Sequence, residues 1–223
     1  MVNFLSEGEI LSCDRFPIGS NYTFIVKIGN PKTGDRFAIY KPKHGEVPLW
    51  DFPSGTLYKR EYAAYLLSVV LGWNFIPETV IRSGPYGVGS VQKYVIPYQN
   101  IPYGDIPEKY RCMLLEIACF DILANNADRK AMHCFIGVEG RVWGIDHGLT
   151  FHHQLKLRTA IWDFWGEKFP VRVSKSLEKL MVRLKRPRGR IKELVGLLEP
   201  IEVEALKIRL NWLMELNAFP TLR

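Results

Sequence analysis

The chain is predicted to adopt an α+β fold with two lobes, a strand-rich first half and a helical second half. Two observations support this prediction. Short apolar, β-branched and aromatic runs fill the first hundred residues around a single helix, and amphipathic helical runs fill most of the remainder. Strands and helices that are segregated along a chain favour an α+β arrangement over an alternating parallel-sheet fold.

In the first half, turn residues such as Pro31 and Gly34 separate the apolar runs, and Gly72 ends the one helical run. The expected elements are strands at Thr23–Ile28, Arg36–Lys41, Glu78–Arg82 and Ser90–Ile96, with a helix at Leu57–Leu71. The glycine-rich segment GPYGVG is expected to bridge the last two strands.

The second half begins with an amphipathic helix expected over Glu108–Leu123, followed by a hairpin whose turn is the Glu-Gly pair at 139 and 140. From Ser174 onward three helices are expected, separated near Pro187 and at Glu199–Pro200. Prolines and a glycine cluster between residues 97 and 107. We therefore predict one domain over residues 1–223, with an N-lobe at 1–97 and a C-lobe at 98–223.

The composition is that of a globular protein, with 223 residues, 47% of them hydrophobic and 24% charged. No run of about 18 apolar residues is present, which argues against a membrane span. The first residues are acidic where a signal peptide needs positive charge, so a cytoplasmic protein is expected. The four cysteines form no Cys-x-x-Cys pair and sit among apolar residues, which predicts buried, reduced thiols.

The formal net charge of +7 implies attraction to anions, but nucleotides, phospholipids, acidic proteins and RNA all fit it. Six basic residues fall between Arg183 and Lys192. They form either a solvated loop between helices or a site for an anionic partner.

The strongest functional pattern joins Asp128, His133 and Asp146. Asp128 follows a long helix in a polar turn, His133 comes five residues later, and the predicted hairpin leads into Asp146. Either aspartate alone is more often a turn cap. Together they follow the order of a phosphoryl-transfer site, in which a base in a loop precedes two metal-holding groups. Asp128 is therefore predicted as the base, and Asp146 and His133 as metal ligands.

Five segments resemble the type II phosphatidylinositol 4-kinases, members of the phosphatidylinositol 3-/4-kinase-like group of atypical kinases. NADRKAMH and GIDHGLTF are similar to that family's catalytic and metal-binding loops, N-T-D-R-x-x-x-N and A-I-D-N-G-L-A-F. AIYKPKHGE resembles its lysine strand, and GSVQKYVIPY resembles the segment ahead of its hinge. FHHQLKLRTAIWDFWGEKFP resembles its basic, tryptophan-rich stretch, so the resemblance spans about residues 19 to 170.

The resemblance implies a bilobed protein-kinase-like fold that uses ATP and Mg²⁺, with Mn²⁺ as an alternative. It makes Lys41 the catalytic, phosphate-contacting lysine and Glu61 its ion-pair partner. The remaining nucleotide contacts are assigned to small residues before the first strand and to the backbone ahead of the hinge, namely Gly19, Ser20, Asn21, Tyr94, Val95 and Ile96.

Two departures from the family pattern bear on function. His133 stands where the family has Asn, and imidazole suits Mn²⁺ or Zn²⁺ better than Mg²⁺, so a metal ligand and a structural histidine both remain open. The family carries an acylated, cysteine-rich insertion after the lysine strand, whereas Pro42–Arg60 contains no cysteine.

The expected function is transfer of the ATP γ-phosphoryl group to an alcohol. Because the anchoring insertion is absent, a protein Ser/Thr or a small polar alcohol is favoured as acceptor over phosphatidylinositol. A nucleotidyl-transferring enzyme, a nucleotide-binding module without catalysis and a nucleic-acid-binding protein remain as alternatives.

Overall fold

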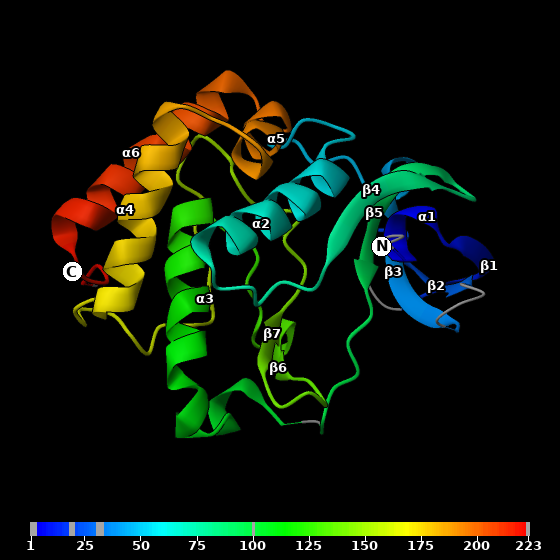
Figure 1. The fold of residues 1–223 in the computed structure, drawn as a ribbon, viewed down its shortest axis with the longest axis horizontal. Helices are drawn as coiled ribbons and strands as arrows, with labels where there is room; N and C mark the ends of the chain where they lie inside the picture. Colours follow the sequence, from blue (N-terminus) through cyan, green and yellow to red (C-terminus); the bar gives the residue numbers. More distant parts are fainter. Residues whose placement is uncertain (1–3, 18–20, 30–33, 100, 222–223) are drawn as a thin grey trace.

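The computed structural model of the chain describes residues 4–17, 21–29, 34–99 and 101–221. An antiparallel sheet forms one end of the molecule and a group of helices forms the other (Figure 1). This arrangement confirms the predicted α+β fold with a strand-rich N-terminal region and a helical C-terminal region. The division of one domain at residues 97 and 98 stays a prediction.

The sheet contains five strands in the order β1-β2-β3-β5-β4, and every neighbouring pair is antiparallel. The strands are β1 (Glu9–Arg15), β2 (Phe24–Gly29), β3 (Arg36–Pro42), β4 (Thr79–Gly84) and β5 (Gly87–Lys93), and the short helix α1 (Phe4–Glu7) precedes them. Alternate residues of β2 are buried, because successive side chains of a strand point to opposite faces. Phe24 and Val26 lie opposite Tyr40 and Ala38 of β3, and these four side chains form most of a small core.

Two parts of the sheet differ from the prediction. β1 was not predicted, since it is an edge strand without a clean alternation of buried and exposed residues. β5 begins inside the glycine-rich segment expected to be a turn, and it ends at Lys93 instead of Ile96. Glycine is required within this strand, because a Cβ on Gly89 would lie 2.4 Å from the backbone oxygen of Lys41.

Helix α2 (Leu57–Leu71) has the predicted bounds and ends at Gly72, whose φ of 76° lies in the left-handed region. Helix α3 (Arg111–Ala124) starts three residues later than predicted, because Glu108–Tyr110 forms a 3-10 turn. Although α2 lies between strands in the sequence, it packs against the C-terminal helices (Figure 1).

The remaining elements follow the predicted order. They are the hairpin of β6 (Cys134–Ile136) and β7 (Val142–Gly144), helices α4 (Val171–Lys185), α5 (Arg190–Gly196) and α6 (Pro200–Leu216), and 3-10 turns at Lys43–Gly45, Tyr103–Asp105 and Ala131–His133. Helices α2, α3, α4, α5 and α6 enclose one large apolar core. Within the part of the chain that the structure describes, no helix combines the length and apolar character needed to cross a bilayer.

All four cysteines are free, as predicted, but their burial differs. Cys119 and Cys134 are buried, and burial raises the pKa of Cys134 to about 11. Cys13 is half-buried and Cys112 is exposed, so the prediction of four buried thiols was wrong. Cys112 lies in the first turn of α3, on the side of the helix that faces solvent.

Candidate active site

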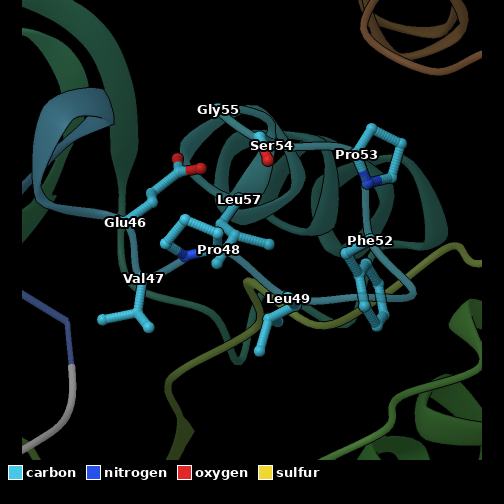
Figure 2. A pocket seen from close by; sticks show the side chains of 9 residues that line it. All are labelled: Glu46, Val47, Pro48, Leu49, Phe52, Pro53, Ser54, Gly55 and Leu57. Carbon is cyan, nitrogen blue, oxygen red and sulfur yellow. The ribbon is translucent and has the colours of Figure 1, made fainter.

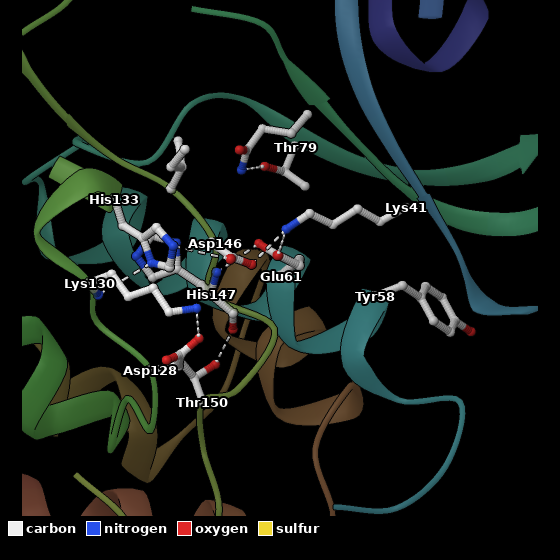
Figure 3. A network of polar contacts seen from close by, with 12 residues as sticks. Lys41, Tyr58, Glu61, Thr79, Asp128, Lys130, His133, Asp146, His147 and Thr150 are labelled. Carbon is white, nitrogen blue, oxygen red and sulfur yellow. Dashed lines mark hydrogen bonds and ion pairs between the residues drawn. The ribbon is translucent and has the colours of Figure 1, made fainter. Parts of the chain in front are cut away.

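Three side chains that are distant in sequence meet at the boundary between the sheet and the helices (Figure 3). Lys41 projects from the end of β3, Glu61 from α2, and Asp146 from the loop after β7. The Nζ atom of Lys41 forms an ion pair with Glu61 Oε1 and a second one, 2.9 Å long, with Asp146 Oδ1. The structure therefore brings together the predicted lysine, its implied partner and a predicted metal ligand.

Lys41 is held as a cation at this point. Burial alone would lower the pKa of Lys41, but the charges of Asp146 and Glu61 outweigh burial and raise it. Lys41 in turn holds the pKa of Asp146 well below its usual range. Glu61 is buried, and its second oxygen accepts a hydrogen bond from the backbone N–H of His147 over 3.0 Å, so the carboxylate is fixed from two sides.

Asp146 adopts an unusual backbone conformation, with a φ of 61° in the left-handed region. Non-glycine residues rarely occupy this region, and such residues gather at functional sites. The conformation turns the carboxylate toward both Lys41 and His133, while 47% of the side chain stays exposed. An exposed carboxylate beside a fixed lysine can still accept a further cation.

His133 is buried, and its Nε2 atom lies 3.4 Å from Asp146 Oδ2. Burial lowers the pKa of His133, which favours the neutral ring. The backbone N–H of Lys130 donates to Nδ1 over 3.4 Å, so the ring proton resides on Nε2 and points at Asp146. Coordination of a metal through Nε2 would require loss of this proton and of the Lys130 hydrogen bond.

Asp128 is joined to this group of residues through Lys130 (Figure 3). Its backbone N–H donates to Asn126 Oδ1 over 3.1 Å, and its Oδ2 atom forms a 2.8 Å ion pair with Lys130 Nζ. The carboxylate is 40% exposed, so an incoming group can reach it.

A buried ion pair beneath Asp128 was not predicted. Arg129 binds Asp121 through two hydrogen bonds of 2.9 Å, and neither side chain is exposed. The same guanidinium donates to the carbonyl of Ile145 over 3.0 Å and to Nε2 of His147 over 2.7 Å. One rigid group therefore links the loop that carries Asp128 to the segment that carries Asp146. The signal in the sequence was the arginine directly after Asp128.

His147 is fully buried and acts as part of this support. Because Arg129 can only donate, Nε2 of His147 accepts and its proton resides on Nδ1. Burial and the charge of Arg129 hold the pKa of His147 well below its ordinary value. The ring is therefore neutral, and among the described residues Nδ1 has no hydrogen-bond partner.

The predicted nucleotide contacts are only partly described. Gly19 and Ser20 lie outside the described residues. Asn21 uses its side-chain oxygen to accept a hydrogen bond from the backbone N–H of Val47 over 2.7 Å, so it supports the loop after β3.

Ahead of the predicted hinge, two backbone groups are already engaged. Tyr94 N–H donates to Phe37 over 3.1 Å, and the Ile96 carbonyl accepts from Val138 over 3.0 Å. Between them, the N–H of Val95 has no backbone partner among the described residues, which leaves it free for a ligand.

The segment after Asp146 runs beside the loop that carries Asp128. The amide of the Asp128–Arg129 peptide bond donates to the Arg158 carbonyl over 2.9 Å, and Arg158 N–H donates to Asn126 over 2.9 Å. Farther along, the side chain of Asn125 donates to the Gln154 carbonyl over 2.6 Å and accepts from Lys156 N–H over 2.9 Å. Residues 154–158 are thus fixed in place by backbone groups and one buried asparagine.

The shallow pocket in Figure 2 lies in the loop between β3 and α2. It is lined by Glu46, Val47, Pro48, Leu49, Phe52, Pro53, Ser54, Gly55 and Leu57. None of these is a predicted site residue. Glu46 Oε1 accepts from the N–H of Tyr58 over 2.8 Å, so this loop supports the start of α2.

Comparison with known proteins identifies a relative. No protein-family model matches the chain. Protein Rv2133c of Mycobacterium tuberculosis is 33% identical, and the match covers 97% of this chain and 89% of that protein. The chain belongs to the Rv2133c family.

Solved structures show the fold of this Rv2133c family member. The Golgi casein kinase with Mn/ADP bound matches with a TM-score of 0.62 and 16% identity, over 96% of this chain and 73% of that one. Hydra Fam20 with sugar matches with a TM-score of 0.58 and 14% identity, over 96% of this chain and 86% of that one. The Helicobacter pylori proinflammatory kinase CtkA matches with a TM-score of 0.52 and 14% identity, over 93% of this chain and 92% of that one. These matches confirm a protein-kinase-like fold, while the resemblance to the phosphatidylinositol 3-/4-kinase-like atypical kinases, and to the type II phosphatidylinositol 4-kinases in particular, stays a prediction.

The donor groups of this family member fit a divalent ion that is shared with a ligand. Among the described residues, no group of three or more His, Cys, Asp or Glu side chains could hold a metal by itself. Asp146 offers exposed carboxylate oxygen, which Mg²⁺ and Mn²⁺ accept. Phosphate oxygens and water would have to complete the coordination, as in sites where Mg²⁺ binds together with a nucleotide.

Proposed function

We propose that this chain is an ATP- and divalent-metal-dependent kinase that transfers the γ-phosphoryl group to an alcohol. The observation that carries the proposal is the convergence of Lys41 with Glu61 and Asp146, beside the exposed carboxylate of Asp128. Phosphoryl transfer requires mainly positioning and charge neutralisation, and these are the groups it uses. The Mn/ADP complex of the Golgi casein kinase, which shares the fold, adds support.

Each side chain has a role in this proposal. Lys41 binds phosphate oxygens, and Glu61, fixed by the His147 N–H, holds Lys41 in place. Asp146 is the metal ligand, and the ion when bound neutralises charge on the transferring phosphoryl group. His133 Nε2 lies 3.4 Å from Asp146 Oδ2, so this buried histidine is a candidate second ligand only after a change of tautomer.

Asp128 is the base. It takes the proton of the acceptor hydroxyl as that oxygen bonds to the γ-phosphorus, while the bond from phosphorus to the bridging oxygen of ADP breaks. In this proposal adenine binds along the backbone of Tyr94, Val95 and Ile96, and the Val95 N–H is the donor because it has no backbone partner among the described residues.

The acceptor in this proposal is a protein Ser/Thr or a small polar alcohol. The loop between β3 and α2 has no cysteine for an acyl anchor, and Trp50 is its one strongly exposed apolar side chain among the described residues. Phosphatidylinositol vesicles and a soluble cell extract, each supplied with Mg·[γ-³²P]ATP, separate the two acceptor classes. A parallel reaction with [α-³²P]ATP tests for nucleotidyl transfer.

Asp128→Asn tests the proposed reaction. Turnover should fall by about 10²–10⁴-fold, the usual effect of removing a general base, while Mg·ATP affinity stays within a few-fold. Asp105→Asn, an exposed aspartate in the turn at Tyr103–Asp105, is the matched control. Near-normal turnover in correctly folded Asp128→Asn would contradict the proposal.

His133→Asn tests the metal ligands. The amide can offer an oxygen without any change of tautomer, so Mg²⁺-supported turnover should rise relative to Mn²⁺-supported turnover. Calorimetry of metal–ATP binding provides a second measurement. An unchanged preference and unchanged affinity would assign His133 to support of Asp146 alone.

A further inference from the structure

An exposed surface beside Asp128 has no role in the reaction described above. It is built by the loop between β3 and α2, by residues 154–158 and by Lys130, and we call it the flanking surface. Its members are Trp50, Asp51, Leu155, Lys156, Arg158 and Lys130.

The apolar part of the flanking surface lies at one end. Trp50 and Leu155 are 93% and 81% exposed, among the highest values for large apolar residues in the described chain. Lys156 joins them, because its Nζ atom lies 5.0 Å from the centre of the Trp50 ring and 2.8 Å from Asp51 Oδ2. Lys156 therefore connects the segment that carries Leu155 to the loop that carries Trp50.

The other end of the flanking surface carries positive charge and lies beside Asp128, the proposed general base. The Arg158 carbonyl accepts from the amide of the Asp128–Arg129 peptide bond, which places Arg158 beside the catalytic aspartate. The Arg158 side chain is exposed, and no acidic side chain of the described residues pairs with it. Lys130 is also exposed and faces Asp128. The surface thus presents more positive than negative charge around Asp128.

Leu155 and Arg158 are three residues apart, so their backbones are separated by at most about 10 Å, since a fully extended chain spans about 3.3–3.6 Å per residue. Three residues of a second extended chain lying beside this segment are enough to cover that distance. Its acceptor hydroxyl would lie at Asp128, an acidic neighbour would meet Arg158, and an apolar side chain three residues away would meet Trp50 and Leu155.

We propose that the flanking surface binds the acceptor as an extended polypeptide, with an acidic residue next to the hydroxyl and an apolar residue three positions from it. This rests on the proposed kinase function and names its substrate class. A bilayer fits less well, because only two apolar side chains protrude and Lys156 covers one face of Trp50. In addition, the carboxylates of Asp51 and Asp128 would face an anionic lipid surface and be repelled by it.

The experiment uses the full chain and two synthetic peptides with one central serine. The first carries Glu on both sides of the serine and Leu three residues away in both directions, and the second has Lys in place of Glu. Phosphorylation is followed with Mg·[γ-³²P]ATP, and binding of the fluorescein-labelled peptides is followed by anisotropy.

Wild-type protein should prefer the Glu peptide. Arg158→Glu should raise its KM at least tenfold with kcat within a few-fold, and should improve use of the Lys peptide. Trp50→Ala should raise KM for both peptides. Lys179→Glu and Trp212→Ala, which alter exposed side chains on α4 and α6, should leave KM and Mg·ATP affinity unchanged.

Equal KM values for wild type and Arg158→Glu would overturn the proposal. Label in phosphatidylinositol vesicles but in neither peptide would also overturn it and would assign the surface to a membrane. If wild type binds the Glu peptide with the same Arg158 dependence but transfers no phosphoryl group, the kinase function fails and the flanking surface stands as a peptide-binding site.

Discussion

The sheet and the helical part of the molecule differ in how much apolar surface supports them. The sheet rests on a small core of Leu5, Phe24, Val26, Ile28, Ala38, Tyr40 and Val91, whereas the helices share one large core. Helix α2 belongs to the large core, although strands precede and follow it in the sequence. Position in the chain therefore does not decide which region an element packs with.

The same difference divides the candidate site. Lys41 is attached to the sheet, while Glu61, Asp128 and Asp146 are attached to the large core or to loops that rest on it. Regions with few buried apolar side chains open at lower free energy than well-packed ones. The lysine therefore sits on the less stable side of the site and the three carboxylates on the more stable side.

The largest effect is expected where the helical region depends on a buried charge. Asp121→Ala leaves the Arg129 guanidinium buried without its partner, which should cost about 3–5 kcal/mol of unfolding free energy. Chemical denaturation measures this loss. Asp105→Ala, at an exposed aspartate, should change it by less than about 0.5 kcal/mol. Equal effects of both substitutions would show that the pair does not stabilise the helical region.

Truncations in the two cores should sharpen the comparison. Leu206→Ala in the large core should cost about 2–5 kcal/mol, and Ile28→Val in the sheet core about 0.5–1.5 kcal/mol. Amide hydrogen exchange should show which of the two regions each substitution destabilises. Ile28→Val should speed exchange in β2 and leave α6 unchanged, whereas Leu206→Ala should speed exchange in both. Faster exchange in α6 of Ile28→Val would mean that the two regions open together.

Glu116 should give the helical region a pH dependence. Burial raises the pKa of Glu116 to about 7, with Arg172 and Arg141 opposing the shift. The folded state then binds more protons than the unfolded state, so stability falls as pH rises from about 4.3 to about 7 and is level above that. Glu116→Gln should therefore gain roughly 1–3 kcal/mol relative to wild type between pH 4 and pH 8. A constant difference across this range would contradict the assignment.

The smallest effect is expected in the basic stretch between Arg183 and Lys192, which runs from the end of α4 into the start of α5. Arg183 donates to the Val70 carbonyl over 3.1 Å, and the basic side chains are exposed. Arg186→Glu with Arg188→Glu should change unfolding free energy by less than about 0.5 kcal/mol. If the double variant elutes from heparin at a lower salt concentration than wild type, the result supports a site for an anionic partner. Elution at the same salt concentration would indicate a solvated loop.

Local signals predicted most of the fold. Apolar periodicity placed α2, and proline and glycine breaks separated α4, α5 and α6. The edge strand β1 was missed because none of its side chains is buried, and the start of β5 was missed because its glycines indicated a turn.

The candidate site was accessible only through motifs. Lys41, Glu61 and Asp146 were found by their place in a kinase-like order, since no local pattern indicates which distant charges will meet. The buried supports were missed for the same reason. Arg129 and Asp121 are polar residues that complete their contacts only after the chain has folded.

The attachment of residues 154–158 has a consequence for how such proteins diverge. These residues are held to the loop of Asp128 by their backbone and by Asn125, so the side chains of Leu155 and Arg158 have little part in folding. Relatives can exchange these two side chains by single substitutions without loss of the fold. New recognition properties can therefore arise through neutral drift on a surface whose scaffold stays constant.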